Sequence, residues 1–147
     1  ISIRNIHFWP FWSNDTNVGR YTKTNATAIM SLRNDNPFFL NIFVYQYKVG
    51  FEFGSSSSGI TQRFSISNAG LDAVATGILI SGNLTTGQIS NCYSHGDGGP
   101  TVGVHGIFVT ASNTRIQISN LHISWVDTNG IRIEGNGSIM MLENLWV

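Results

Sequence analysis

Charged residues are scarce in this sequence of 147 residues, where Asp, Glu, Lys and Arg together make up only 11% of the chain. A typical domain is about 25% charged. The 8 basic and 8 acidic residues also cancel. This balance excludes the basic surface of a nucleic-acid-binding protein and the acidic tail of a solvating segment. The surface must therefore take its polarity from Ser, Thr, Asn and Gly.

Cysteine and long apolar runs are also missing. Cys92 is the single cysteine, so an internal disulfide is excluded and the redox compartment stays open. No apolar run approaches the roughly 18 residues of a membrane span, and the N-terminus has no signal-peptide pattern. We therefore expect one domain, residues 1–147, without a membrane partner. Because the chain begins at Ile1 and neither end carries a polar cap, we expect a segment that the rest of a longer parent chain covers at both ends.

Helix-forming residues are few, whereas β-branched residues are abundant. The chain has 17 Ile, 12 Thr and 9 Val, but only 2 Lys, 3 Glu, 4 Gln and 6 Ala. Gly, Ser and Asn are frequent between the apolar segments, as in turns that join short strands. The composition predicts an all-β protein.

An asparagine marks an internal repeat. Six asparagines each follow an apolar residue two places earlier, at intervals of 36, 27, 23, 29 and 24 residues: Asn5, Asn41, Asn68, Asn91, Asn120 and Asn144. A second marker is a glycine before alternating apolar residues, at Gly50, Gly77, Gly106 and Gly130. The distance from glycine to the next asparagine is nearly constant. The distance from asparagine to glycine varies, with insertions at about 9–27 and 94–104.

Aligned repeats give columns of apolar residues. The position after each asparagine holds Ile6, Ile42, Ala69, Cys92, Leu121 and Leu145, and the first apolar position of the glycine strand holds Phe51, Ile78, Ile107 and Ile131. Such columns are typical of a coil whose turns stack like residue on like residue, about 4.8 Å apart. We expect the asparagines to form a ladder at an inside corner, and Cys92 to be an inert core residue.

This pattern resembles the single-stranded right-handed parallel β-helix of the pectin-lyase-like superfamily, which includes pectate lyases, polygalacturonases and bacteriophage tailspikes. The resemblance covers nearly the whole chain, as about five to six coils. It implies that the glycine strands and the loops before them form a carbohydrate cleft. Both insertions leave the same corner of the coil, so we expect them to wall a shallow trough beside these strands.

Aromatic and polar side chains near this trough are the candidates for sugar binding, since aromatic faces stack on sugar rings and polar groups bond hydroxyls. They are Trp9, Trp12, Tyr21, Tyr45, Tyr47, Glu52, Phe108 and Arg132. Two plainer interpretations stay open. The segment from Trp9 to Trp12 could fold back as a local hydrophobic cluster, and Arg132 could be a surface residue paired with Glu134 or Glu52. His7 and His122, each one place off a core column, should face solvent.

The candidates for catalysis are Asp72, His95, Asp97 and His105. The first three could form an acid/base group or a weak calcium site, although a glycine-rich turn capped by Asp97 is the commoner explanation. His105 and Arg132 resemble the histidine and arginine of polygalacturonases, with Arg132 reading a sugar carboxylate. However, Glu134 stands where that family has lysine, and the stretch 76–81 lacks the family's paired aspartates. Hydrolysis needs two carboxylates, so polygalacturonase activity is excluded.

Three functions remain open. The resemblance is greatest to a phage tailspike that binds polysaccharide, with or without degrading it, which implies a homotrimer on a virion. The second is a segment of a secreted pectate-lyase-like enzyme or glycoside hydrolase, which would be extracellular. The third is a structural or adhesin coil without activity. In each case neither nucleic acid nor membrane is an expected partner.

Overall fold

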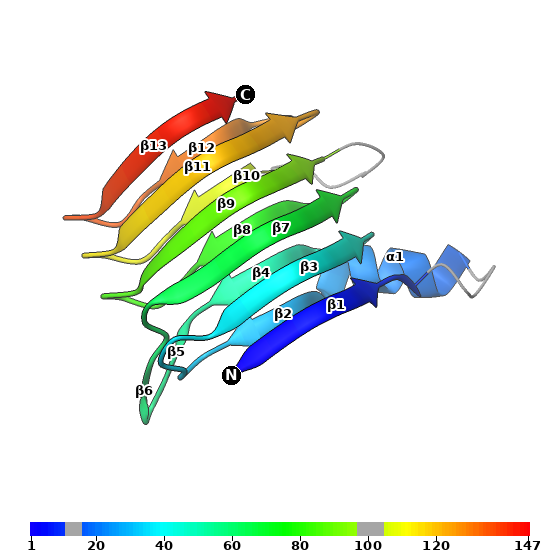
Figure 1. The fold of residues 1–147 in the computed structure, drawn as a ribbon. Helices are drawn as coiled ribbons and strands as arrows, with labels where there is room; N and C mark the ends of the chain where they lie inside the picture. The colour runs from blue at the N-terminus through cyan, green and yellow to red at the C-terminus, as the bar shows by residue number, and fades with distance from the viewer. Residues whose placement is uncertain (11–15, 97–104) are drawn as a thin grey trace.

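The asparagine-marked segments stack into one parallel sheet and the glycine-marked segments into another (Figure 1). The computed structural model describes residues 1–10, 16–96 and 105–147. The first sheet, here the asparagine sheet, contains in spatial order β1 (Ser2–Phe8), β3 (Phe38–Tyr45), β7 (Phe64–Asp72), β9 (Thr86–His95), β11 (Arg115–Ser124) and β13 (Ile139–Trp146). The second, the glycine sheet, contains β2 (Thr27–Ser31), β4 (Val49–Phe53), β8 (Thr76–Ile80), β10 (His105–Val109) and β12 (Asn129–Ile133).

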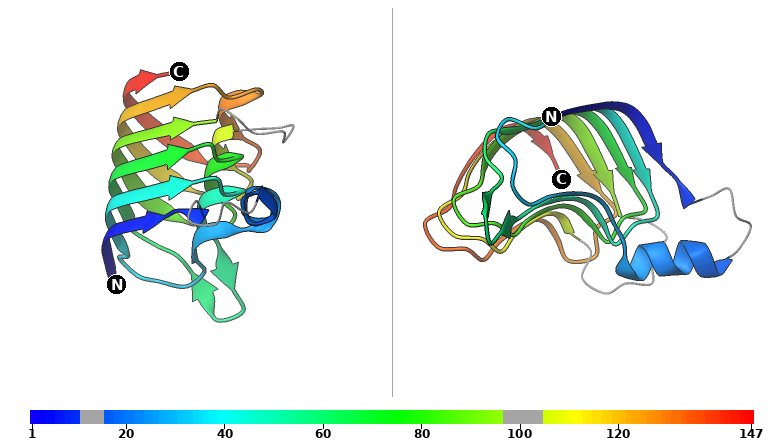
Figure 2. Two further views of the ribbon diagram at one scale, coloured as in Figure 1. Left: turned by 90° about the vertical axis from the view of Figure 1, so that its right-hand side faces the viewer. Right: turned by 90° about the horizontal axis from the view of Figure 1, so that it is seen from below.

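The chain alternates between these two sheets, so the protein is a parallel β-helix, as the repeat predicted. Seen from the N-terminal end, it winds clockwise as it recedes, which makes the helix right-handed (Figure 2). The five strands of the glycine sheet form four neighbouring pairs, and each pair is separated by one turn of the coil. About four turns therefore carry both sheets, slightly fewer than the five to six coils expected.

The core lies between the two sheets and consists of the predicted columns. Ile66, Ile89 and Ile118 stack in register in one sheet, and Phe51, Ile78 and Ile107 stack in the other. All six side chains are almost completely buried. Burying an aliphatic or aromatic side chain of this size stabilises a fold by about 1.5–3 kcal/mol. The stacked columns thus hold successive turns together.

Cys92 belongs to this core as a small buried residue. Burial raises the pKa of its thiol to about 11. At neutral pH the thiol is therefore protonated, as expected for an inert packing residue.

The predicted asparagine ladder is present, but the expectation of an inside corner is wrong. All six asparagines are exposed and have left-handed backbone, with φ between 50° and 59°. The left-handed residue interrupts the strict alternation of the strand, so the residue before the asparagine and the asparagine itself both point outward. The parallel register skips the asparagine at each step. Side-chain amide bonds of 2.7–3.0 Å connect the turns instead.

Among the described residues the ladder has one gap: the side chains of Asn68 and Asn91 form no hydrogen bond with each other. At this step the register resumes only at Gly70 and Tyr93, one residue later than at the other steps. A Cβ atom on Gly70 would lie 2.5 Å from the Tyr93 hydroxyl oxygen. The Tyr93 ring thus lies directly over the glycine, and this close approach requires a residue without a side chain.

The glycine column forms the corner through which the chain enters the glycine sheet. A Cβ atom on Gly77 would lie 2.5 Å from the carbonyl oxygen of Gly106, and one on Gly106 would lie 2.7 Å from that of Gly130. Successive turns approach so closely here that only glycine fits. This packing explains why the second sequence marker is invariant in four repeats.

Two elements depart from the plain coil. The first insertion contains an α-helix, α1 (Thr16–Asn25), which lies beside the coil (Figures 1 and 2). A short antiparallel hairpin, β5 (Ser55–Ser56) and β6 (Gly59–Ile60), extends the connection after β4. For the part of the chain that the structure describes, the expectation of an all-β chain therefore holds except for α1. Among the described residues, no helix has the length and apolar character needed to cross a membrane.

Candidate functional site

Most of the sequence candidates among the described residues fall on two outer surfaces of the coil. Trp9, Tyr45, Asp72 and His95 come from the end of the asparagine-sheet strands. Glu52, Phe108 and Arg132 occupy one outward column of the glycine sheet. The two sets therefore lie on different sheets.

Two rows of side chains cross the outer surface of the asparagine sheet beyond the ladder, and we call this surface the aromatic face. The first row holds the residues two places after each asparagine: His7, Phe43, Gly70, Tyr93, His122 and Trp146. The second row holds the residues four places after: Trp9, Tyr45, Asp72, His95 and Ser124. Strand alternation places both rows on the same outer side. Ten of these eleven positions carry a side chain.

The rings of the first row contact one another across strands. His7 and Phe43 have ring centroids 5.5 Å apart, and His122 and Trp146 have centroids 5.4 Å apart. Trp146 is 74% exposed, so one face of its indole is open to solvent. The prediction that His7 and His122 face solvent is confirmed, since both are exposed. The row is a surface on which a planar apolar group could stack.

Trp9 joins the first row to the second. Its ring centroid lies 5.6 Å from that of Phe43 and 5.8 Å from that of Tyr45. The interpretation that this segment folds back over the coil is thus correct for Trp9. Trp12 lies outside the described residues. Trp9 remains partly exposed and extends the aromatic face toward β1.

Asp72 and His95 are in register on the neighbouring strands β7 and β9. A carboxylate and an imidazole therefore emerge side by side in the second row, one strand spacing apart. Asp97, the third member of the predicted group, lies outside the described residues. Asp72 also acts on Tyr93 in the first row. Partial burial and the negative charge of Asp72 raise the pKa of the Tyr93 hydroxyl, which keeps it protonated and able to donate a hydrogen bond.

Trp125 extends the aromatic face at its edge. Its ring is stacked on that of His95, with centroids 6.0 Å apart and planes inclined by 16°. The residue is 72% exposed, yet its backbone is left-handed, with φ of 57°. A bulky residue in this region costs roughly 1–2 kcal/mol relative to glycine. Backbone strain recurs at functional sites, and together with its stacking on His95 this makes Trp125 a candidate for ligand contact.

The glycine sheet carries a smaller cluster around Phe108. The ring of Phe108 contacts the ring of His105 at 4.8 Å, and the guanidinium of Arg132 lies 5.3 Å from its centroid. Arg132 forms an ion pair with Glu134, as the plainer interpretation of the sequence expected. Glu52, two turns away, accepts a hydrogen bond from the Ser81 hydroxyl at 2.8 Å. These polar groups already have partners within the protein.

His105 is the buried member of this cluster, with only 6% of its surface exposed. Its Nδ1 atom has no hydrogen-bond partner in the described part of the chain. Burial and the positive charge of Arg132 lower its pKa, although Glu134 acts in the opposite direction. A neutral imidazole can still exchange protons, so the predicted role of His105 in acid/base chemistry stays a prediction.

The remaining candidates lie apart from both surfaces. Tyr47 points inward, packs against the core and contacts Phe8 edge-on at 6.4 Å. Tyr21 lies on α1 and is largely exposed. The second insertion falls mostly within residues 97–104, outside the described residues, so the trough between the insertions stays a prediction.

The sequence analysis did not predict the first row of the aromatic face, although the residues after each asparagine indicate it. Five of the six residues two places after an asparagine are aromatic or histidine, and the sixth is Gly70. The resemblance places the cleft on the glycine strands, whereas this row lies on the asparagine sheet; the candidates of the glycine strands stay predictions.

No protein-family model matches the sequence, and no curated protein and no solved structure is significantly similar to it. The described residues contain no group of three or more His, Cys, Asp or Glu side chains that could hold a metal ion. The calcium site considered from the sequence stays a hypothesis, because Asp97 is among the residues outside the description.

Proposed function

We propose that the aromatic face binds an extended polysaccharide that runs across the strands, parallel to the axis of the β-helix. The observation that carries this proposal is the register of Tyr93, His122 and Trp146 on three successive strands. Neighbouring strands are about 4.8 Å apart, which is close to the advance of one sugar unit in an extended chain. Each ring of the row would thus meet a successive sugar.

The chemistry of the face suits sugars. Aromatic rings offer apolar surfaces to the carbon–hydrogen faces of a pyranose, while Asp72, His95 and the Tyr93 hydroxyl can bond its hydroxyl groups. The low charge of the chain also fits a ligand that is recognised by stacking and hydrogen bonds. The β-helix with its ladder supports the wider proposal of a pectin-lyase-like coil of the tailspike type, secreted or part of a virion.

Binding should be tested by glycan-array screening, followed by titration of intrinsic tryptophan fluorescence with the best oligosaccharide. Tyr93→Ala and Trp146→Ala should each weaken binding by about 1 kcal/mol, or roughly fivefold, the scale of a lost aromatic contact. Tyr21→Ala is the matched control, because it removes an exposed tyrosine from α1 rather than from the aromatic face. Loss of affinity in Tyr21→Ala alone would contradict the proposal and favour the trough beside the insertions.

Cleavage of the bound chain is a second proposal, which rests on the pairing of Asp72 with His95. A carboxylate next to an imidazole is an arrangement that acid/base catalysis uses, in a lyase as well as in a hydrolase. Asp72→Asn and His95→Gln keep the shape of the side chains and should leave binding nearly intact. If the pair acts in catalysis, release of reducing ends or of unsaturated product should fall on the order of a hundredfold. Equal turnover in both variants and the wild type would contradict a catalytic role for this pair.

A further inference from the structure

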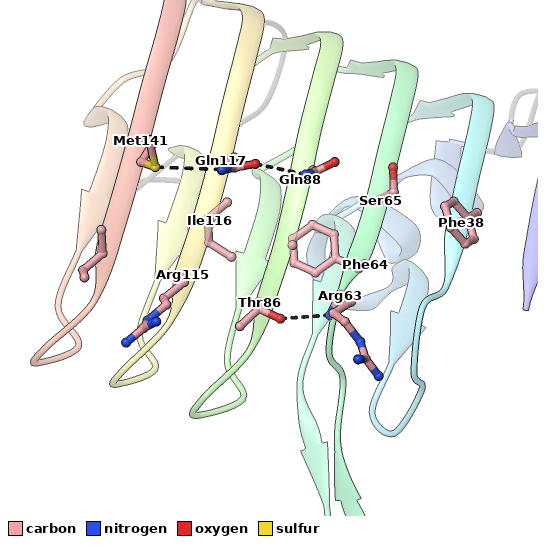
Figure 3. Close-up of a pocket in the computed structure, with 12 residues that line it drawn as sticks. Phe38, Arg63, Phe64, Ser65, Thr86, Gln88, Arg115, Ile116, Gln117 and Met141 are labelled. Carbon is pink, nitrogen blue, oxygen red and sulfur yellow. Dashed lines mark hydrogen bonds between the residues drawn. The ribbon is translucent and has the colours of Figure 1, made fainter.

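A groove crosses the outer surface of the asparagine sheet on the other side of the ladder, over the first halves of the strands (Figure 3). Its volume is about 770 Å³. Small and polar residues of β7 and β9 form its floor, among them Ser65, Thr86 and Gly87. The groove is separate from the aromatic face, because the exposed asparagines lie between the two.

The walls of the groove are side chains that project above this floor. Phe38 on β3 and Met141 on β13 belong to the same register row and are 53% and 61% exposed. Between them, the Gln88 amide donates to Gln117 Oε1 at 3.0 Å, and the Gln117 amide reaches the Met141 sulfur at 3.9 Å. The row thus offers apolar walls with amide groups between them, a combination that suits the two faces and the hydroxyl groups of a sugar chain.

Two arginines stand at the groove on either side of Thr86. The backbone N–H of Arg63 donates to Thr86 Oγ1 at 3.0 Å, and Arg115 is in register with Thr86 on the next strand. The arginines are therefore two strand spacings apart, about 10 Å along the axis. This separation is close to the length of one disaccharide. Two carboxylates on a sugar chain could meet the two guanidinium groups in turn.

The positive charges of Arg63 and Arg115 are not neutralised by acidic side chains of the groove. No carboxylate occurs among the described residues that line it. The Arg63 guanidinium lies 3.4 Å from Asp35, but both side chains are mostly exposed, and such surface pairs contribute little. No ion pair of Arg115 is present in the described part of the protein. Both arginines can therefore turn toward an anionic ligand, and guanidinium–carboxylate pairs are among the stronger hydrogen-bonded contacts.

We propose that this groove is a second carbohydrate site, which binds an acidic oligosaccharide through Arg63 and Arg115. The apolar walls contact the sugar rings, the glutamine amides bond hydroxyls, and the arginines bind carboxylates on alternate sugars. The site does not depend on the aromatic face, since no residue belongs to both.

The test uses hexagalacturonate and oligomannuronate as probes, with methyl-esterified hexagalacturonate as the neutral counterpart, in calorimetric titrations. The wild type should bind an acidic probe, with an affinity that falls as salt rises. Arg63→Gln and Arg115→Gln should each weaken this binding about tenfold, and methyl-esterification should weaken it at least as much. Arg20→Gln, an exposed arginine on α1, is the matched control and should bind like the wild type. Thermal unfolding checks that all variants are folded.

Three results would overturn the site: neither acidic probe binds, the ester binds as tightly as the acid, or the arginine variants bind like Arg20→Gln. The two proposals fail separately. If Tyr93→Ala weakens glycan binding while both arginine variants bind normally, the aromatic face stands and the groove falls. If the arginine variants lose the acidic probes while Tyr93→Ala and Trp146→Ala lose no ligand, the groove stands and the aromatic face falls.

Discussion

The Nδ2 atom of Asn120 donates a hydrogen bond to Oδ1 of Asn91 on the preceding turn at 3.0 Å, and both residues have left-handed backbone at an exposed corner. Asn144 donates in turn to Asn120. The ladder therefore performs two tasks. It reverses the inward–outward alternation of the strand at each asparagine, and its side-chain bonds replace the pairing that the backbone loses there.

These two tasks can be separated by substitution of Asn120. Asn120→Ala should lower the free energy of unfolding by about 1–3 kcal/mol, because it loses both amide bonds and forces alanine into a left-handed conformation. Asn120→Gly loses the same bonds but tolerates the conformation, so it should be about 1 kcal/mol more stable than the alanine variant. Urea unfolding measures both, with Ser119→Ala as a neighbouring control. Equal stability of the alanine and glycine variants would show that backbone conformation does not matter at this corner.

Leu84 occupies a left-handed position for which leucine is poorly suited. Its φ is 62°, its side chain is 54% exposed, and its N–H donates to the Ser112 carbonyl at 3.0 Å. The same corner in the next two turns holds Asn113 and Gly137, also with positive φ. Leu84→Asn should therefore raise the free energy of unfolding by about 1 kcal/mol.

The reciprocal substitution provides the control for this prediction. Asn113→Leu places leucine in the same conformation one turn later and should lower stability by a similar amount, again measured by urea unfolding. If both substitutions lower stability, the exposed Leu84 side chain makes contacts that outweigh its backbone strain, and the prediction is wrong.

The core was predictable from sequence because its periodicity is simple. Ile66, Ile89 and Ile118 recur at the same place before an asparagine, and they stack as expected. The direction of the asparagine side chain was not predictable from the same rule. One left-handed residue reverses the inward–outward alternation of a strand, and sequence alternation alone does not reveal on which residue the reversal falls.

The helix α1 shows a different limit. Its sequence contains threonine and asparagine, which are weak helix formers. Its end is held by tertiary structure, since the N–H of Lys48 donates to the Thr22 carbonyl at 2.9 Å and Lys23 is buried. Local propensity cannot anticipate contacts of this kind. The aromatic face shows yet another limit, because the members of its first row are 23 to 36 residues apart in the sequence and become neighbours only when the turns stack.

His105 should make the stability of the protein depend on pH. Its pKa is lowered in the folded state from the ordinary value of 6.5, by burial and by the charge of Arg132. Below about pH 6.5 the unfolded chain therefore binds a proton at this position more readily than the folded protein does. Stability is then lost as the pH falls through this range, and it levels off only below the folded pKa.

The measurement is the free energy of unfolding of the wild type and of His105→Gln between pH 5 and pH 8. Glutamine is neutral throughout, so the variant should lack the contribution of His105 to the decline below pH 6.5. All other ionisable groups are common to both proteins and cancel in the comparison. The difference in stability between wild type and variant should therefore be constant above pH 7 and should change in favour of the variant as the pH falls. Parallel curves over the whole range would mean that His105 accepts a proton as easily in the folded protein as in the unfolded chain, and that its burial against Phe108 and Arg132 has no electrostatic consequence.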